Sequence, residues 1–263
     1  MGGNMMSEKA YSNQSTDKAL DIIELLAVAE EPLRLQTIAE RLNMNASTAL
    51  RFINSLKRRG YVMQENDTPK YYLSMKICSL SYNVLKSSNI AKLAAPYLAA
   101  VSEAFRECAC LSKESDMSVL YIGMHDGPDR MLRTFSYIGK VAPMHCTGSG
   151  KLFLMEYNQE RIEEYYLRKG LPMLTPHTIT SLPRLMDELR KIHGRGYSLD
   201  DEECELGTRC VAVPVRDYTG RIVAAMSVTG PSNRMTQEKI DAHIDSLIEA
   251  ADGVSKLLGY VTE

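Results

Sequence analysis

The C-terminal half of this sequence contains the side-chain types that nucleophilic catalysis uses. Cys210 carries a thiol, His145 an imidazole and Asp200 a carboxylate. A thiol next to an imidazole can be activated as a nucleophile. None of the three residues stands in a nucleophile-elbow motif or in a cysteine-nucleophile signature. An enzyme of small carboxylates with Cys210 as its nucleophile is therefore an alternative that the motifs do not favour, and we expect a protein that is not an enzyme.

Thiols can also bind a metal or respond to oxidation. The chain has six cysteines and no Cys-x-x-Cys pair. Cys108 and Cys110 would point to the same face of a strand, but no second pair of ligands follows nearby, which argues against zinc. A regulator that senses a metal or the thiol redox state through Cys146, Cys204 and Cys210 is a further alternative. We expect no cofactor and no bound metal.

A different set of polar groups suits a small anionic ligand. Gly148 and Ser149 begin a predicted helix, whose first backbone N–H groups have no partner within the helix and can bind a carboxylate. Ser227 and Thr229 lie two apart in an apolar run that predicts a strand, so their hydroxyl groups share one face. Buried hydroxyl groups need polar partners, and a polar ligand would supply them.

In the N-terminal half, the segment from Ala46 to Arg59 predicts a helix with two different faces. Ala49, Phe52, Ile53 and Leu56 recur at helical spacing and predict the buried side. The other side carries groups of the kinds that read base edges and bind phosphates. Its residues are Ser47, Leu50, Arg51, Asn54 and Arg58. A solvated face with a basic last turn, which suits the helix dipole, is the alternative.

The elements around this helix favour DNA binding. The segment from Leu35 to Leu42 predicts a preceding helix, and Gly60 ends the second one. Two short β-like runs then flank a turn-forming segment, Glu65 to Pro69, which is typical of a hairpin. Helix, turn, helix and hairpin form a winged helix-turn-helix motif. A first helix from Thr16 to Ala29, with Thr16 as its cap, would complete the core.

The rest of the chain predicts an α+β domain. An apolar stripe between Met75 and Lys86 predicts a linker helix, and Ile90 to Arg106 a further helix with a kink or restart at Pro96. Short β-like runs and helices then predict a mostly antiparallel sheet flanked by helices. The expected division is a disordered tail (1–14), a winged helix-turn-helix domain (15–74), a linker helix (75–89) and the α+β domain (90–263).

Composition limits the class of protein. The net charge is −2 and the pI about 6.3, so DNA binding must rely on a local basic patch. No apolar run approaches the roughly 20 residues that a membrane span needs. The N-terminal segment lacks the apolar core of a secretory signal. These features predict a cytoplasmic protein without a membrane partner.

Taken together, these motifs resemble the IclR family of bacterial transcriptional regulators. The resemblance is carried by Ser47–Arg51, Pro143–Lys151, Gly196–Glu203, Cys210–Val215 and Ser227–Pro231. It extends from about Thr16 to the C-terminus, and its C-terminal motifs are specific. It implies a winged helix-turn-helix domain, a linker helix and a GAF-like domain that binds a small organic-acid effector. It also implies a homodimer or a dimer of dimers on palindromic double-stranded operators.

The resemblance maps an effector site onto this chain. The residues are Met131, Ala142, His145, Gly148, Ser149, Asp200, Cys210, Ser227 and Thr229. By position, His145 would lie at the mouth of this site and Cys210 would form a wall or simply fill the core. Asp200 would accept a hydrogen bond from a ligand hydroxyl or cap a turn of its own backbone.

The outer face of the second helix and the wing supply the expected DNA-binding set. It consists of Ser47, Thr48, Leu50, Arg51, Asn54, Arg58 and Lys70. Leu50 departs from the family, which often has a polar residue there, usually His. An exposed Leu50 could contact a thymine methyl group, and the alternative is that it packs inward.

Overall fold

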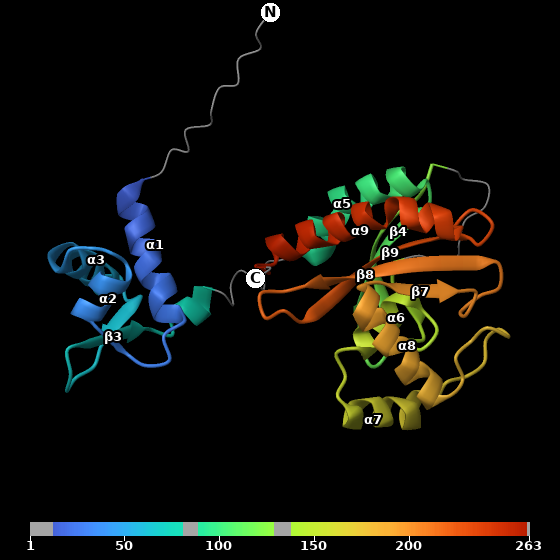
Figure 1. The fold of residues 1–263 in the computed structure, drawn as a ribbon, viewed down its shortest axis with the longest axis horizontal. Helices are drawn as coiled ribbons and strands as arrows, with labels where there is room; N and C mark the ends of the chain where they lie inside the picture. Colours follow the sequence, from blue (N-terminus) through green and yellow to red (C-terminus); the bar gives the residue numbers. More distant parts are fainter. Residues whose placement is uncertain (1–12, 81–88, 129–137, 262–263) are drawn as a thin grey trace, which may run out of the picture. The chain divides into compact units, whose positions relative to one another are not determined.

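The computed structural model describes residues 13–80, 89–128 and 138–261 (Figure 1). The chain forms two compact units, with the division between Ser88 and Asn89. Most of the predicted tail and residues 81–88 of the predicted linker helix lie outside the described residues, as does Met131 of the predicted effector site. Within the described part of the linker, residues 76–80 are helical.

The first unit is a three-helix core with a small sheet. Its elements are α1 (Gln14–Ala27), β1 (Leu33–Arg34), α2 (Leu35–Arg41), α3 (Ala46–Arg58), β2 (Val62–Gln64) and β3 (Lys70–Leu73). Each helix contributes a fully buried isoleucine to one core: Ile22, Ile38 and Ile53. β2 and β3 pair antiparallel and form the wing. This arrangement confirms the predicted winged helix-turn-helix motif.

Two details of this unit differ from the prediction. β1 adds a third strand to the wing, because Leu33 pairs with Tyr71 of β3. A strand of two residues shows no alternation, so the sequence does not reveal it. The cap of α1 is Asn13, whose side chain accepts hydrogen bonds from the N–H groups of Ser15 and Thr16. The predicted cap at Thr16 is therefore wrong, since Thr16 lies inside the helix.

The second unit is built on one antiparallel sheet. Its strands are β4 (Cys108–Glu114), β5 (Val119–His125), β6 (Val141–Ala142), β7 (Ser198–Asp201), β8 (Thr208–Arg216) and β9 (Ile222–Pro231). They lie in the order β6-β5-β4-β9-β8-β7, and every neighbouring pair is antiparallel. β4 and β9 are therefore central strands, although more than a hundred residues separate them in sequence.

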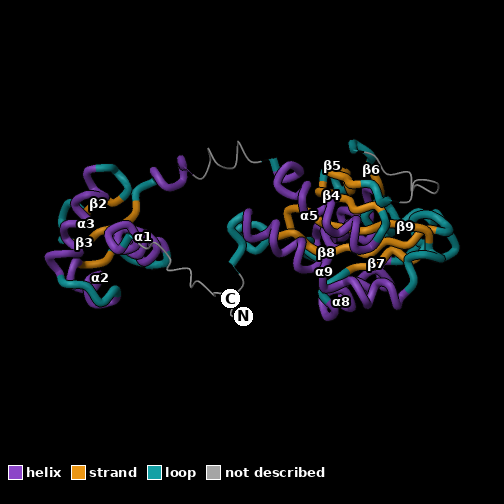
Figure 2. Tube along the Cα trace, turned by 90° about the horizontal axis from the view of Figure 1, so that it is seen from above, coloured by secondary structure: helices purple, strands orange, loops and turns teal. Residues whose placement is uncertain are grey.

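Helices cover both faces of this sheet (Figures 1 and 2). They are α5 (Ile90–Phe105), α6 (Gly148–Leu154), α7 (Gln159–Lys169), α8 (Leu182–Arg195) and α9 (Gln237–Leu257). α5 and α9 pack side by side on one face, with Phe105 and Leu247 in the shared core. α6, α7 and α8 lie on the other face around a second core that contains Phe153 and Tyr165. The α+β prediction is confirmed.

The expected restart at Pro96 does not occur. α5 runs continuously from Ile90 to Phe105, and Pro96 faces solvent. The apolar side of α5, with Leu98 and Val101, is held by the sheet and by α9. This packing maintains the helix across the backbone position that cannot donate a hydrogen bond.

Candidate functional site

The outward face of α3 is open to solvent. Ala49, Ile53 and Leu56 are the buried residues of this helix. The predicted DNA-reading residues line a shallow groove on the opposite side. They are Ser47, Leu50, Arg51, Asn54 and Arg58. Leu50 is 36% exposed, so it belongs to this face and does not pack inward.

Basic side chains of α3 point in two directions. The guanidinium of Arg51 lies 5.3 Å from the ring centre of Phe52, a contact that orients it along the outward face. Lys57 instead turns toward the wing, where its Nζ donates to Gln64 Oε1 at 2.7 Å. Thr48 and Lys70, the other predicted DNA contacts, are half-buried. The positive charge on this outward face therefore comes mainly from Arg51 and Arg58.

The turn of the wing carries acidic side chains. Glu65 is held by a hydrogen bond from the Thr68 hydroxyl, while Asp67 is exposed. The hairpin closes through the Glu65 N–H, which donates to the Lys70 carbonyl at 3.0 Å. Carboxylates at this tip would repel phosphate groups, so the tip itself is not a basic phosphate-binding element.

In the second unit, the register of the sheet aligns four polar side chains in one row. Thr229 of β9 pairs with Cys108 of β4 on one side and with Cys210 of β8 on the other. Cys210 in turn pairs with Asp200 of β7. Side chains that are directly opposite in neighbouring strands share a face. A hydroxyl, two thiols and a carboxyl group therefore lie across four strands.

A second row on the same face contains Ser227. This residue lies between Cys110 of β4 and Ala212 of β8, two positions along from Thr229. Ser227 is 1% exposed, and its Oγ makes no hydrogen bond of normal geometry among the described residues, although it lies close enough to the Cys210 thiol to lower the pKa of that thiol. A buried hydroxyl without a partner costs about 1–3 kcal/mol. Ser227 is thus an unsatisfied polar group in the floor of the predicted effector site.

α6 covers part of this face at close range. A Cβ at Gly148 would lie 3.2 Å from Ala212 Cβ and 3.6 Å from Cys210 Sγ, so the glycine lets the helix approach β8. Ser149, the next residue, is buried. The structure therefore brings Gly148 to the same face as Cys210.

The Asp200 side chain caps the turn that follows it. Its Oδ1 accepts hydrogen bonds from the N–H groups of Glu203 at 2.9 Å and Cys204 at 3.2 Å. It is buried, and burial raises the pKa of the carboxyl to about 7, although these bonds and the nearby Lys151 oppose the shift. Of the two predicted roles, the structure shows the turn-capping one. Because the pKa is about 7, the protonated and the ionised carboxyl are both populated near neutral pH.

A buried ion pair anchors the same turn. Lys151 of α6 is fully buried and its ammonium binds Glu203 Oε1. The hydroxyl of Thr178 donates to the Glu203 carbonyl at 2.6 Å, and that of Thr175 to the Glu202 carbonyl, also at 2.6 Å. The β7–β8 turn is therefore fixed against α6 and the 175–178 segment.

His145 and Ala142 line a hollow that Cys210 and Ser227 do not line. The His145 ring bonds the Pro172 carbonyl at 3.1 Å and the Tyr165 hydroxyl at 3.4 Å. Burial is the main reason why the pKa of His145 is lowered. Both His145 and Ala142 line a hollow of about 290 Å³ with Tyr165 and Pro172. His145 therefore has a structural hydrogen-bonding role, and no hydrogen bond found among the described residues joins it to Cys210.

Sequence reasoning missed Tyr121 of β5. Its side chain is partly buried, and its phenol lies near the polar rows. Burial raises its pKa well above the ordinary value, and the nearby Cys210 and Cys110 raise it further. Burial and Asp200 likewise raise the pKa of Cys210 to about 12, so that thiol stays protonated. Alternation along β5 could have placed Tyr121 on a buried face, but only the strand order brings it near Cys210.

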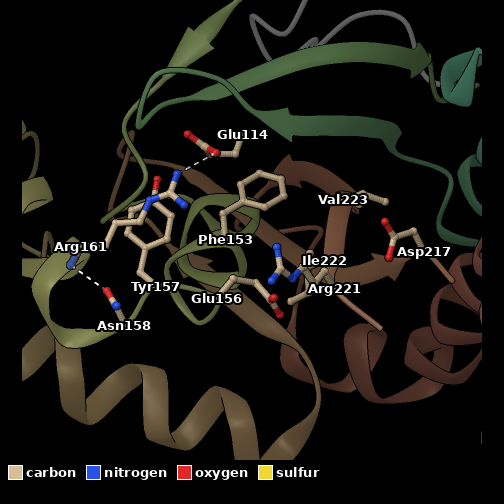
Figure 3. A pocket seen from close by; sticks show the side chains of 10 residues that line it. All are labelled: Glu114, Phe153, Glu156, Tyr157, Asn158, Arg161, Asp217, Arg221, Ile222 and Val223. Carbon is tan, nitrogen blue, oxygen red and sulfur yellow. Dashed lines mark hydrogen bonds and ion pairs between the residues drawn. The ribbon is translucent and has the colours of Figure 1, made fainter. Parts of the chain in front are cut away.

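The second unit also has a separate open pocket (Figure 3). It measures about 550 Å³ and lies between the end of β4, the α6–α7 connection and the β8–β9 hairpin. Arg161 stacks 4.0 Å from the ring centre of Tyr157 and pairs with Glu114 at 3.4 Å. The charged groups of this pocket largely pair with one another or with neighbours. None of the predicted effector residues lines it.

The described residues offer no metal site and no membrane-spanning helix. Over ranges 13–80, 89–128 and 138–261, no group of three or more His, Cys, Asp or Glu side chains is arranged to hold a metal ion. Within the same ranges, no helix combines the length and apolar character that crossing a membrane requires. All six cysteines are described, and none of them forms a disulfide.

Comparison with known proteins identifies the family. Residues 15–66 match the model of the IclR helix-turn-helix domain, and residues 82–256 match that of the bacterial transcriptional regulator IclR C-terminal domain. The chain belongs to the IclR family of bacterial transcriptional regulators. It is thus a DNA-binding transcriptional regulator, as its relatives are, and these relatives are not enzymes.

Individual relatives of this IclR-family regulator align over nearly the whole chain. An uncharacterized HTH-type transcriptional regulator of Haemophilus influenzae is 32% identical over 259 residues, which cover 97% of each chain. The DNA-binding transcriptional repressor YiaJ of Escherichia coli is 32% identical, with 96% of this chain and 90% of YiaJ covered. The crystal structure of Thermotoga maritima IclR matches with a TM-score of 0.62 and 31% identity, covering 94% of this chain and 99% of that one.

Proposed function

We propose that this IclR-family regulator binds a palindromic operator as a homodimer or dimer of dimers, and that a small organic acid controls this binding. The reading element is the outward face of α3. The effector site is the polar face of the C-terminal sheet around Ser227 and Thr229. The protein acts in the cytoplasm, where the operator and small metabolites are both present.

The exposure of α3 supports the DNA-reading half of this proposal. Arg51 can bind guanine or phosphate, and Asn54 can pair with adenine. Leu50 adds an apolar contact that suits a thymine methyl group. Two copies of α3 in a dimer would enter major grooves about one helical turn apart, roughly 34 Å, which explains an operator with two-fold symmetry. Thr48 and Lys70 would contact the sugar-phosphate backbone at the edges of this face.

The unsatisfied Ser227 hydroxyl is the observation that carries the sensing half. A ligand carboxylate would accept its hydrogen bond and remove the cost of burying it alone. Thr229 on the same face and Ser149 of α6 would add further hydroxyl donors. Gly148, Cys210 and Asp200 would shape the rest of the site, whereas Ala142 and His145 line a separate hollow with Tyr165. Small aliphatic and aromatic acids both fit this chemistry.

Control requires that the acid binds two arrangements of the protein with different affinities. The difference in binding free energy then appears as a change in operator affinity, and by reciprocity DNA changes the affinity for the acid. The chain between the units, which includes the predicted linker helix, is the covalent path for this coupling.

A thermal-shift experiment tests acid binding directly. Full-length protein is heated with pyruvate, gluconate or benzoate in turn, as wild type and as Ser227→Ala. At least one acid should raise the melting temperature of the wild type by several degrees, because a ligand that binds only the folded state stabilises it. The shift should shrink in Ser227→Ala and persist in the control Ser232→Ala, which follows β9. An equal shift in all three proteins would exclude Ser227 from the site.

The enzyme alternative has no support in the geometry. Cys210 keeps its proton because burial raises the pKa of its thiol, and its near neighbour Asp200 is engaged by the β7–β8 turn. His145 bonds other partners. A nucleophile needs a base within hydrogen-bond reach, and these three residues do not provide that arrangement.

A further inference from the structure

The helix α3 ends beside the start of the predicted linker helix. Its last residue is Arg58, and Gly60 takes a φ of +77° that turns the chain out of the helix. The chain comes back to this place after the wing, because the Ser74 N–H donates to the Tyr61 carbonyl at 2.8 Å. Residues 74–80, which we call the linker start, therefore begin next to the end of α3 within the first unit.

Ser74 bonds both helix ends through one hydroxyl group. Its Oγ accepts a hydrogen bond from the Lys76 N–H at 3.2 Å and so caps the first turn of the linker start. That turn continues with the Ile77 N–H, which donates to the Ser74 carbonyl at 3.3 Å. The Ser74 hydroxyl donates its own proton to the carbonyl of Gly60, just past α3. The linker start is thus anchored on the residue at which the chain leaves α3.

Lys76 holds the same end of α3 through its side chain. Its Nζ donates to the carbonyl of Arg59, the C-cap of α3, at 2.6 Å. The ammonium also lies 4.5 Å from the ring centre of Tyr61, within the range of a cation–π contact. The stem of the side chain passes close to Gly60, since a Cβ there would lie 3.8 Å from Lys76 Cδ. A cation in this position also suits the negative end of the α3 dipole.

These contacts rest on a firm support. Tyr61 packs against the core that contains Ile53 of α3, and its N–H donates to the Leu56 carbonyl at 2.9 Å. The helix itself is continuous over 13 residues, Ala46–Arg58. A packed helix of this length moves as one body, so a displacement of its last turn also moves the outward face that carries Arg51.

Lys76 is the only charged residue of the linker start, whose sequence is SMKICSL. The basic residues of α3 engage other parts of the unit. Lys57 bonds Gln64 of the wing, and Arg58 lines the groove on the outward face. The ionic link between the linker start and the end of α3 therefore depends on Lys76.

We propose that Lys76 is a positioning residue for DNA reading, which fixes the angle between the linker start and α3. It acts through Arg59 and Tyr61 and makes no contact with DNA. The orientation of the linker then decides how α3 is presented to the major groove. This inference rests on the proposed reading face of α3, and it adds the contact through which the linker acts on that face.

The size of the effect follows from the orientations that α3 can adopt. A palindromic operator requires two copies of α3 in the correct orientation at the same time. Without the Lys76 contacts, each copy holds that orientation for a smaller fraction of the time, and the apparent affinity falls by that fraction. A fraction that falls to about one third in each copy weakens binding roughly tenfold, because the two factors multiply.

Operator titrations of full-length variants test the proposal. The probe is a labelled duplex that the wild type selects from random double-stranded DNA. Lys76→Met keeps most of the apolar stem and removes the ammonium, and it should weaken binding about threefold to tenfold. Lys76→Arg keeps a charged donor and should retain most of the wild-type affinity. Lys191→Met, at an exposed position of α8 in the second unit, is the matched control and should bind as the wild type does.

The salt dependence separates positioning from direct contact with DNA. A lysine that binds a phosphate group contributes about 0.9 to the slope of log affinity against log salt concentration. Lys76→Met should keep the wild-type slope, because Lys76 acts on α3 and not on the phosphates. A slope that is smaller by about one would overturn the proposal. Titration at a temperature at which circular dichroism shows every variant fully folded excludes unfolding as the cause of weaker binding.

Unchanged affinity of Lys76→Met, or equal losses in Lys76→Met and Lys76→Arg, would also overturn the proposal. Arg51→Ala, measured on the same duplex, distinguishes this failure from failure of the reading face. If Arg51→Ala weakens binding and Lys76→Met does not, only the role of Lys76 is wrong. If Arg51→Ala has no effect, the reading face is wrong, and the role of Lys76 with it.

Discussion

Ser227 and Asp200 show how single residues set the character of the buried sheet face. Ser227 has a hydroxyl without a partner, which favours an incoming acceptor. Asp200 is satisfied by two backbone N–H groups, yet burial raises the pKa of its carboxyl to about 7. A carboxylate ligand next to Asp200 would be repelled by the charged form and tolerated by the acid. Proton uptake should therefore accompany binding of an anion.

Asp200 also predicts a pH dependence of stability. The folded-state pKa lies above the ordinary value of about 3.9, so the folded protein binds this proton more tightly than the unfolded chain does. The stabilisation is complete below the unfolded-state pKa and is lost as pH rises through about 7. Between about pH 6 and pH 8, the melting temperature of wild type should fall more than that of Asp200→Asn, whose amide oxygen still accepts both bonds. Differential scanning fluorimetry measures these melting temperatures. An equal fall with pH in wild type and in Asp200→Asn would contradict the prediction.

Arg51 is the residue on which the reading face depends most. Arg51→Ala should weaken binding to the operator by about tenfold or more, since a base contact by arginine is worth about 1–3 kcal/mol. A gel shift at fixed salt measures the change. Arg190→Ala is the control, because Arg190 is an exposed arginine of the second unit that pairs with Asp187. Unchanged affinity of Arg51→Ala would show that α3 does not read DNA through this face.

Residue types predicted some of these roles and left others undecided. Helical spacing placed Arg51 and Asn54 on the exposed side. It did not settle Leu50, because a leucine is compatible with either face, and its exposure required coordinates. Position in sequence suggested that His145 borders the effector site. Its ring orientation depends on Tyr165 and Pro172, which come from distant segments and cannot be inferred locally.

At the scale of elements, the contact between α6 and the β7–β8 turn depends on one buried ion pair. Lys151→Met should destabilise the folded state by about 3–5 kcal/mol, because Glu203 would be left as an unpaired buried carboxyl group. The double variant Lys151→Met/Glu203→Gln should recover much of this loss. Chemical denaturation measures both. Lys169→Met is the control, since its pair with the exposed Asp116 should contribute less than about 1 kcal/mol. Similar losses for both lysines would refute the role of burial.

A substitution in the wing should strengthen operator binding, whereas Arg51→Ala should weaken it. Asp67→Asn removes an exposed carboxylate near the DNA and should raise operator affinity, by roughly twofold to fivefold at low salt and less as salt screens the repulsion. Fluorescence anisotropy over a salt series tests this. Asp187→Asn, in the second unit, should have no effect. Equal or weaker binding by Asp67→Asn would mean that this carboxylate does not face the phosphates.

Long elements were easier to predict than short ones. The starts of α3 and α5 agree with the segments predicted from sequence. β1 has two residues and no pattern, and it exists because it pairs with β3. The sheet order is the other part that sequence cannot supply. Only the pairing of β4 with β9 places Cys108 and Cys110 opposite Thr229 and Ser227, and no local signal specifies that pairing.

For the whole molecule, the central claim joins two units that each have their own core. The N-terminal core supports α3, and the C-terminal sheet supports the polar rows. Each unit is supported by buried contacts of its own. On the proposed function, acid binding at Ser227 would have to alter how two copies of α3 are presented to DNA. A stable change in the assembly, and not a change inside α3, is the expected means.

Operator affinity of the full-length protein, with and without an acid that binds it, tests this claim most directly. Wild type and Ser227→Ala are titrated with labelled operator at one salt concentration. The acid should change wild-type affinity by about fivefold or more, a coupling near 1 kcal/mol. Ser227→Ala should bind the operator as wild type does when no acid is present, and should lose most of the response to the acid. An acid response of equal size in both proteins, or bound acid with no effect on operator affinity, would contradict the account.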